Sequence, residues 1–366
     1  MKLNPMSFSG KAVLALAFSA ALITSCSKED AEYKRRRRTT PTTETPTTPT
    51  DTVATPAPTT PTTPSTGTVA YLSLPTSGAK NLSGQSNVVI ENLRFVDISG
   101  NPLLLNGSSN ITIRNCFFDR ASAEAISIEN SSNITIENCL FNGVTTGVYA
   151  LGSKTIKIRN NQFVNVRMRS TGGRGQFVQF NNVSGEGNLI ENNQGENFAG
   201  ESDPEDLISL YQSSGTASSP ISVRNNMFRG GGPSTSGGGI MTGDYGGGYQ
   251  IVENNTLLDP GQYGIASAGG SNISLINNKI YARQQPFTNN PLYVWAQQGA
   301  SCSNITVKGN RVNWTDKSGS INNGWNAGNC SNTSFEDPTT ISLSEMGVPS
   351  HLITFITPAE LLEIRN

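Results

Sequence analysis

The sequence contains a single histidine, His351, among 366 residues. One imidazole argues against catalytic triads built on histidine and against histidine-rich metal sites. The five cysteines lack the spacing of a zinc site with histidine partners. Acidic and basic residues nearly cancel, and the net charge is -1. Neither nucleic acid nor an anionic membrane surface is therefore favoured as a partner.

Long apolar runs are scarce as well. The clearest one, residues 12–23, is too short to span a membrane. Lys2 and Lys11 precede it, and it leads into Leu22-Ile23-Thr24-Ser25-Cys26. This N-terminus resembles a bacterial lipoprotein signal, which implies cleavage before Cys26 and lipid on its sulfur. An ordinary signal peptide is the alternative. We expect residues 1–26 to direct export, and lipid on Cys26 to hold the protein at the outer membrane, at the cell surface.

Residues 27–68 have too few apolar side chains to form a core, because residues 39–68 are almost entirely Thr and Pro. Proline keeps such a segment extended, so we predict a disordered spacer between the membrane and a domain at residues 69–366. The basic run at residues 34–38 is either solvated linker charge or a contact with acidic lipid or polysaccharide.

The domain is built from a repeat. Ser109-Asn110-Ile111-Thr112-Ile113-Arg114-Asn115-Cys116-Phe117-Phe118 returns as Ser132-Asn133-Ile134-Thr135-Ile136-Glu137-Asn138-Cys139-Leu140-Phe141, 23 residues later. A fixed period of this length is typical of stacked coils, and alternating apolar and polar residues indicate strands. One apolar position marks each of about ten coils: Ile90, Ile113, Ile136, Ile158, Ile190, Val223, Val252, Leu275, Val307 and Phe335.

An asparagine or glycine follows two residues after most of these markers. Both residue types tolerate the left-handed backbone of a tight bend, and stacked asparagines can hydrogen-bond along the rod. The column comprises Asn92, Asn115, Asn138, Asn160, Asn192, Asn225, Asn254, Asn277 and Gly309. The pattern over residues 69–336 resembles the right-handed parallel β-helix of the pectin-lyase-like superfamily. The resemblance implies an all-β fold, a single-stranded right-handed parallel β-helix with an asparagine ladder. A helix at residues 358–364, capped by Thr357, is expected to cover the open end of the rod.

The repeat is interrupted by four insertions that all fall at the same point of the coil, at residues 167–175, 200–205, 230–239 and 283–291. Stacked insertions make a wall, and a wall beside a flat sheet makes a groove. The floor of this groove is predicted to consist of one outward-facing column: Gln179, Ser209, Met241, Ala266 and Tyr293. The glycine run at residues 230–239 lacks the ending of a phosphate loop, so it either lets a bound chain approach or simply turns a corner.

The insertions carry the candidate chemistry. Residues 201–206 hold four carboxylates, Asp244 lies about one coil further on, and Arg167, Arg169 and Arg174 lie about one coil before. Such groups can bind Ca²⁺, cleave glycosides by acid–base chemistry, or neutralise a sugar acid. The alternative is a solvated acidic loop paired with arginines. The candidate catalytic residues are Arg169, Arg174, Glu205, Asp206 and Tyr263. The candidate metal ligands are Asp203, Asp206 and Asp244. The candidate substrate-binding residues are Gln179, Ser209, Tyr211, Met241, Tyr293 and Arg283.

The resemblance implies an activity on polysaccharide, most often as a lyase that cleaves uronic-acid polymers by β-elimination. Neither the pectate-lyase Arg-x-Pro-x-x-Arg motif nor the polygalacturonase motifs are present, so no catalytic residue can be carried over from those families. A glycoside hydrolase and a non-catalytic glycan-binding or adhesive protein are the alternatives. We expect a monomer that binds an acidic glycan. Cys116 and Cys139 stack on neighbouring coils, as do Cys302 and Cys330, and each pair could be reduced or a disulfide.

Overall fold

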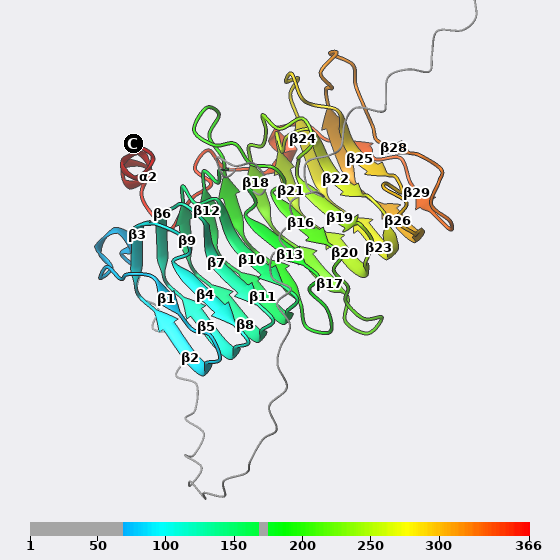
Figure 1. Ribbon diagram of the computed structural model, residues 1–366. Helices are drawn as coiled ribbons and strands as arrows, with labels where there is room; N and C mark the ends of the chain where they lie inside the picture. The colour runs from blue at the N-terminus through cyan, green and yellow to red at the C-terminus, as the bar shows by residue number, and fades with distance from the viewer. Residues whose placement is uncertain (1–68, 168–174) are drawn as a thin grey trace, which may run out of the picture.

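The computed structural model describes residues 69–167 and 175–366. Three ten-stranded sheets, all parallel, form the walls of one elongated rod (Figure 1). Each turn of the chain contributes one strand to each sheet, so neighbours in a sheet are three strands apart in the sequence. The fold is the predicted β-helix, with ten coils.

The strands of each sheet follow one another along the rod. Sheet 1 comprises β1 (Lys80–Asn81), β4 (Leu103–Asn106), β7 (Glu124–Glu129), β10 (Thr146–Leu151), β13 (Val178–Asn181), β16 (Ile208–Tyr211), β19 (Ile240–Asp244), β22 (Tyr263–Ser267), β25 (Asn290–Val294) and β28 (Trp325–Asn326). Sheet 2 comprises β2 (Ser86–Glu91), β5 (Ser109–Arg114), β8 (Ser132–Glu137), β11 (Lys154–Arg159), β14 (Leu189–Glu191), β17 (Ile221–Arg224), β20 (Gly248–Glu253), β23 (Gly270–Ile276), β26 (Cys302–Lys308) and β29 (Ser334–Phe335). Sheet 3 comprises β3 (Arg94–Ile98), β6 (Phe117–Ala121), β9 (Leu140–Asn142), β12 (Gln162–Val164), β15 (Gln194–Glu196), β18 (Met227–Arg229), β21 (Thr256–Leu258), β24 (Lys279–Ala282), β27 (Arg311–Trp314) and β30 (Thr339–Thr340).

The apolar markers lie in register along sheet 2, as the repeat predicts. Ile90, Ile113 and Ile136 are direct neighbours on adjacent strands, and the column continues without a slip to Phe335. From Ile113 to Val307 these side chains are fully buried. Sheet 3 adds a stack of phenylalanine rings with centroids 4.7–5.0 Å apart, which comprises Phe95, Phe118, Phe141 and Phe163. The lumen of the rod is therefore filled by similar apolar side chains that stack from coil to coil.

The bend asparagines adopt the left-handed conformation, with φ between 52° and 57°. The expectation that their side chains form the hydrogen-bonded ladder is wrong, because the ladder uses the next residue. In that inner column each side-chain amide nitrogen donates to the amide oxygen of the next coil at 2.9–3.0 Å. Since Cβ direction alternates along the chain, the residue after the bend turns into the rod and becomes buried. The inner column comprises Asn161, Asn193, Asn226, Asn255, Asn278 and Asn310.

The four cysteines of the described residues form one free pair and one disulfide. Cys116 and Cys139 occupy the inner column in the early coils, where both are buried and free, and the amide of Cys139 donates to Oδ1 of Asn161 at 2.9 Å. Cys302, at the start of β26, forms a disulfide with Cys330 in the segment before β29, with their Cα atoms 4.6 Å apart.

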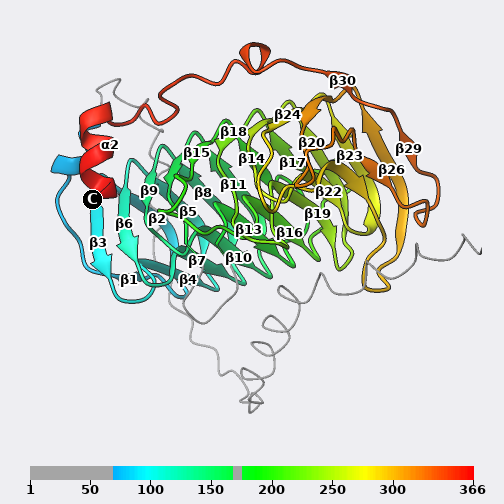
Figure 2. The ribbon, with the colours of Figure 1, turned by 90° about the horizontal axis from the view of Figure 1, so that it is seen from above.

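The C-terminal segment runs back along the outside of the rod. After η2 (Ser344–Met346) it passes over the outer face of sheet 3 and ends in α2 (Pro358–Arg365), which lies beside β3 and β6 (Figure 2). Tyr71 of η1 (Tyr71–Ser73) packs in the same cluster as Leu361 and Ile364 of α2. Thr357 caps α2 as predicted. However, α2 does not close an open end of the rod. Leu361 and Ile364 pack on an outward apolar stripe of sheet 3 that comprises Phe117, Leu140 and Val164. The described residues contain no helix that is long and apolar enough to cross a membrane.

Candidate functional site

The insertions share one corner of the rod, as predicted. They lie between sheet 3 and sheet 1, in the connections from β12 to β13, β15 to β16, β18 to β19 and β24 to β25. The carboxylates and arginines carried by these connections are therefore brought to one side of four coils. Arg169 and Arg174 lie outside the described residues, as does Cys26.

The predicted floor column is in register but is not an open floor. Gln179, Ser209, Met241, Ala266 and Tyr293 are successive neighbours along sheet 1. The first four are at most 8% exposed. Met241 and Ala266 pack with Tyr263 in a small apolar cluster outside the lumen. The side-chain amide of Gln179 and the hydroxyl of Ser209 are buried, and neither has a hydrogen-bond partner within the described residues.

Within the described residues, a hollow of about 930 Å³ lies between the insertions and the ends of the sheet 3 strands, away from the predicted floor on sheet 1. Asp203 and Arg283 are the candidate residues that line it, with Arg229, Phe198 and Phe287. Two of its three arginines are paired with acids, whereas Nε of Arg167 donates to the backbone carbonyl of Glu201 at 2.9 Å. Arg283 is paired with Asp259, and Nη1 of Arg229 lies 2.9 Å from Oε1 of Glu196. The hollow is thus lined by charged groups of both signs.

The acidic segment at residues 201–206 is divided between two environments. Glu201 accepts from Nε and Nη2 of Arg365 in α2, at 2.8 and 2.5 Å, and this contact holds its pKa below the usual value. This carboxylate therefore fastens the C-terminal segment to the second insertion. Asp203 lines the hollow, whereas Asp206 contacts Tyr263 at the edge of sheet 1.

Asp206 and Tyr263 form the most perturbed pair near the insertions. Asp206 is 4% exposed and Tyr263 is 1% exposed. The Tyr263 hydroxyl and the backbone N–H of Gly238 both donate to Oδ1 of Asp206. Burial raises the pKa of Asp206 well above its usual value, and the nearby charge of Glu205 raises it further. Burial, and then the charge of Asp206, raise the pKa of Tyr263 as well. Both groups therefore favour their protonated forms.

Glu205 is held by two serines that the sequence did not single out. Ser236 donates to its Oε1 at 2.7 Å and Ser234 to its Oε2 at 2.9 Å. Both serines lie in the glycine-rich insertion, whose backbone presses against its neighbours. A Cβ on Gly238 would lie 2.8 Å from the Tyr263 ring, and one on Gly237 would lie 2.2 Å from the carbonyl oxygen of Glu205. These glycines permit close approach of protein backbone. The signal in the sequence was the pair Ser234 and Ser236 between two runs of glycine.

The remaining candidates are placed as follows. Asp244 ends β19 and lies near enough to Asp206 to raise its pKa. Tyr211 ends β16, and its ring lies 5.2 Å from that of Tyr245. Among residues 69–167 and 175–366, no group of three or more His, Cys, Asp or Glu side chains is arranged to hold a metal ion. The Ca²⁺ site stays a prediction.

Comparisons with known proteins agree with the architecture. A family model described as "Right handed beta helix region" matches residues 76–215. The three parallel sheets make the described residues a parallel β-helix, and over residues 76–215 the match agrees with the right-handed form. No curated protein sequence gives a significant match.

Solved structures with a similar fold share little sequence with this chain. A mutant tailspike protein of E. coli bacteriophage HK620 in complex with a pentasaccharide is 12% identical, with a TM-score of 0.44, over 70% of this chain and 51% of that one. The Streptococcus pneumoniae surface protein and adhesin PfbA is 17% identical, with a TM-score of 0.44, over 70% and 69%. The catalytic domain of a GH87 alpha-1,3-glucanase in complex with nigerose is 15% identical, with a TM-score of 0.45, over 72% and 50%. The matched region spans about half of the tailspike and glucanase chains.

Proposed function

We propose that the protein binds a polysaccharide beside the insertions and cleaves it with Asp206 as proton donor and Glu205 as the second carboxylate. The observation that carries the proposal is the buried Asp206–Tyr263 hydrogen bond next to a serine-held Glu205. A carboxyl group whose pKa is raised by burial can donate its proton to a glycosidic oxygen, while a second carboxylate acts as base or nucleophile. Both carboxyls belong to adjacent residues just before β16, and both side chains are at most 6% exposed, which limits their freedom to move.

β-Elimination on a uronic-acid polymer is the second candidate, and the Tyr263 phenol favours it. A buried phenol with a raised pKa remains a proton donor for the leaving oxygen. The lyase mechanism also needs a base and a group that neutralises the uronate, roles for which Arg169 and Arg174 are the candidates. In the hydrolase mechanism Tyr263 instead orients Asp206.

The test is incubation of the full-length protein with a panel of neutral and uronate-containing polysaccharides. Reducing ends and the ultraviolet absorbance of unsaturated uronates are measured together. We expect new reducing ends without that absorbance. Ends accompanied by absorbance would establish the lyase instead, and retention of a glycan without either would leave only a binding protein. A parallel sample with chelator tests the predicted Ca²⁺.

The variant Asp206→Asn keeps the shape of the side chain and its acceptor oxygen but cannot donate the proton. We expect it to fold and to lose activity by at least a hundredfold. The matched control is Glu186→Gln, in the connection from β13 to β14, which neutralises a carboxylate of another corner. Full activity in Asp206→Asn would remove this pair from the mechanism.

We also propose that the protein acts at the cell surface, anchored by lipid on Cys26. The sequence pattern at residues 22–26 supports this placement, and the spacer at residues 27–68 would carry the rod away from the membrane. Labelling of the wild type by a fatty-acid analogue, and loss of the label in Cys26→Ser, is the expected result. Equal labelling of both would disprove the anchor.

A further inference from the structure

The C-terminal end of sheet 1 carries a cluster of aromatic side chains, which we call the aromatic end: Tyr293, Trp295 and Trp325. The Trp295 and Trp325 ring centroids are 5.6 Å apart, at an interplanar angle of 59°. Trp325 is 43% exposed, and its strand β28 is the last in sheet 1 (Figure 1). A large part of the Trp325 side chain is thus open to solvent.

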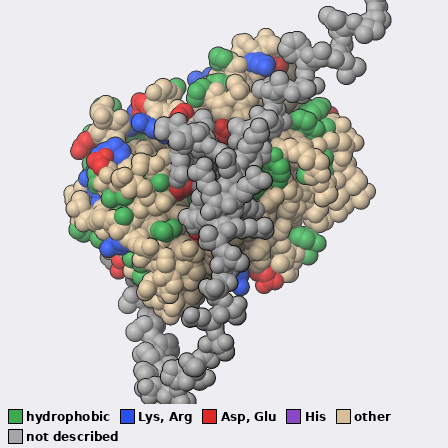
Figure 3. Space-filling view, in the orientation of Figure 1, with side chains coloured by type: hydrophobic (Ala, Val, Ile, Leu, Met, Phe, Trp, Pro, Cys, Tyr) green, Lys and Arg blue, Asp and Glu red, His purple; other side chains and the backbone are tan. Residues whose placement is uncertain are grey.

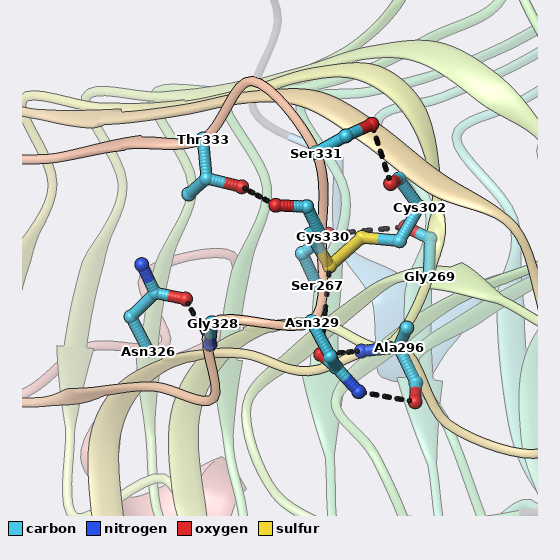
Figure 4. Close-up of a disulfide and its surroundings, with 10 residues drawn as sticks. All are labelled: Ser267, Gly269, Ala296, Cys302, Asn326, Gly328, Asn329, Cys330, Ser331 and Thr333. Carbon is cyan, nitrogen blue, oxygen red and sulfur yellow. Dashed lines mark hydrogen bonds between the residues drawn. A yellow bond between two sulfur atoms is a disulfide. The ribbon is translucent and has the colours of Figure 1, made fainter.

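Hydrogen bonds and a disulfide join the chain segments that carry Trp295 and Trp325. Oδ1 of Asn329 accepts from the backbone N–H of Ala296 at 2.9 Å, and Nδ2 of Asn329 donates to the Ala296 carbonyl at 3.0 Å. Asn329 is thus hydrogen-bonded twice to the residue that follows Trp295. The next residue, Cys330, is joined to Cys302 by the disulfide (Figure 4). Ala327, two residues after Trp325, donates its backbone N–H to the carbonyl of Val294 at 2.9 Å. Such pre-organisation reduces the entropy lost when a ligand binds.

The chemistry around the aromatic end is neutral. Residues 284–307 and 318–335 contain no Asp, Glu, Lys or Arg, and they are rich in Asn and Gln. The Gln297 side chain donates to the Tyr293 hydroxyl at 3.2 Å. Aromatic faces cover the apolar C–H face of a sugar ring, and side-chain amides both donate to and accept from hydroxyl groups. An anionic ligand would instead call for Arg or Lys.

The aromatic end also lies in line with the proposed cleavage site. Trp325 is the register neighbour of Tyr293, which continues the column through Ala266 and Met241 to Ser209. Ser209 and Trp325 are therefore four coil spacings apart, roughly 19 Å. A short oligosaccharide that runs along the rod can reach from one to the other.

We propose that the aromatic end is a binding subsite for neutral sugar residues of the polysaccharide, which stack on Trp325 and Trp295. The inference rests on the proposed function in that its ligand is a glycan, but it concerns binding and not cleavage. In this proposal, the part of the glycan bound over the last two coils consists of neutral sugars.

The test is binding of the full-length protein to neutral glycans, namely β-glucan, α-glucan, mannan and xylan, with polygalacturonate and alginate as acidic comparisons. Retardation in glycan-containing gels gives the affinity. Intrinsic fluorescence reports on the same surface, because the chain has three tryptophans and the third, Trp314, is fully buried. We expect at least one neutral glycan to bind and to change the fluorescence. Trp325→Ala should weaken its binding about tenfold or more, and Trp325→Phe should restore part of it.

Tyr249→Ala is the matched control, since Tyr249 is a 37% exposed aromatic residue on sheet 2, and it should bind like the wild type. Unchanged affinity in Trp325→Ala, or binding of acidic glycans only, would overturn the subsite and leave the proposed cleavage standing. Binding through Trp325 without cleavage of any glycan would support the subsite and refute the proposed cleavage. A dimer that dissociates in Trp325→Ala would show that a second copy covers this surface, which also overturns the subsite.

Discussion

Replacing Asn226 by alanine removes one rung of the inner asparagine ladder. Asn226 is 1% exposed. Its Oδ1 accepts from the backbone N–H and the side-chain amide of Asn193 at 3.0 and 2.9 Å. Its Nδ2 donates to the Ile190 carbonyl at 3.0 Å and to Oδ1 of Asn255 at 2.9 Å. Alanine removes all four bonds and leaves the buried Asn193 N–H without its acceptor.

The expected cost follows from these contacts. A buried donor that loses its acceptor costs about 1–3 kcal/mol, and each remaining hydrogen bond contributes about 1 kcal/mol. The ladder is polarised along its length, so the losses are partly shared between coils. We therefore expect Asn226→Ala to lower the free energy of unfolding by about 3–5 kcal/mol.

The adjacent residue supplies the control. Asn225 is exposed and lies at the bend with φ 55°, and alanine there costs only the left-handed conformation, about 1–2 kcal/mol. Guanidinium unfolding followed by far-ultraviolet circular dichroism gives both values, provided that the slopes agree. A loss in Asn226→Ala no larger than that in Asn225→Ala would refute the assignment of the ladder to the inner column.

Three further outcomes are expected. Leu361→Ala should destabilise the protein by about 2–3 kcal/mol, because Leu361 is 7% exposed in the contact between α2 and sheet 3. The control Leu362→Ala should cost less than about 0.5 kcal/mol, because that side chain is 56% exposed. Equal effects in thermal unfolding would contradict the docking of α2. Asp206 has a raised pKa in the folded state, so its contribution to stability is present below about pH 3.8, its unfolded value, and is lost as the pH rises through the folded value. Asp206→Asn should therefore melt progressively higher than the wild type as the pH rises from 4 to 8, and a constant difference would show an unperturbed carboxyl. In alkylation followed by mass spectrometry, Cys116 and Cys139 should be modified once the protein is unfolded, even without reductant, because they are free but buried. Cys302 and Cys330 should be modified only after reduction. Modification of Cys302 in the native, unreduced protein would disprove the disulfide.

The C-terminal segment links the insertions to the early coils. Arg229 donates to the carbonyl of Ser350 at 3.3 Å. Oε1 of Gln162 accepts hydrogen bonds from the backbone N–H groups of Thr354 and Phe355, at 2.9 and 2.8 Å. Arg365 then reaches Glu201 in the second insertion. Contacts from coils far apart thus converge on one segment, which opposes the separate unfolding of coils that repeat architectures otherwise allow.

The sequence by itself determined the coil. Ile113 and Ile136 pair in register because their 23-residue offset and the period-2 alternation are local properties that every coil repeats. Asn115 and Asn138 bend the chain because their side chains tolerate the left-handed backbone wherever they occur. The position of the insertions followed from the same arithmetic, since an extra segment can only bulge where the strands stop.

Only the tertiary structure decided what contacts what outside the coil. Cys116 and Cys139 look as well placed for a disulfide as Cys302 and Cys330, yet the first pair is free in the inner column and the second is bonded. The described hollow lies over the ends of sheet 3, whereas beside the predicted floor Tyr263 packs against Met241 and donates a hydrogen bond to Asp206. The helix α2 found the stripe at Phe117 and Leu140 rather than an end of the rod. Such contacts depend on which surfaces are still apolar once the coils are stacked, and the pattern within one coil carries no information about that.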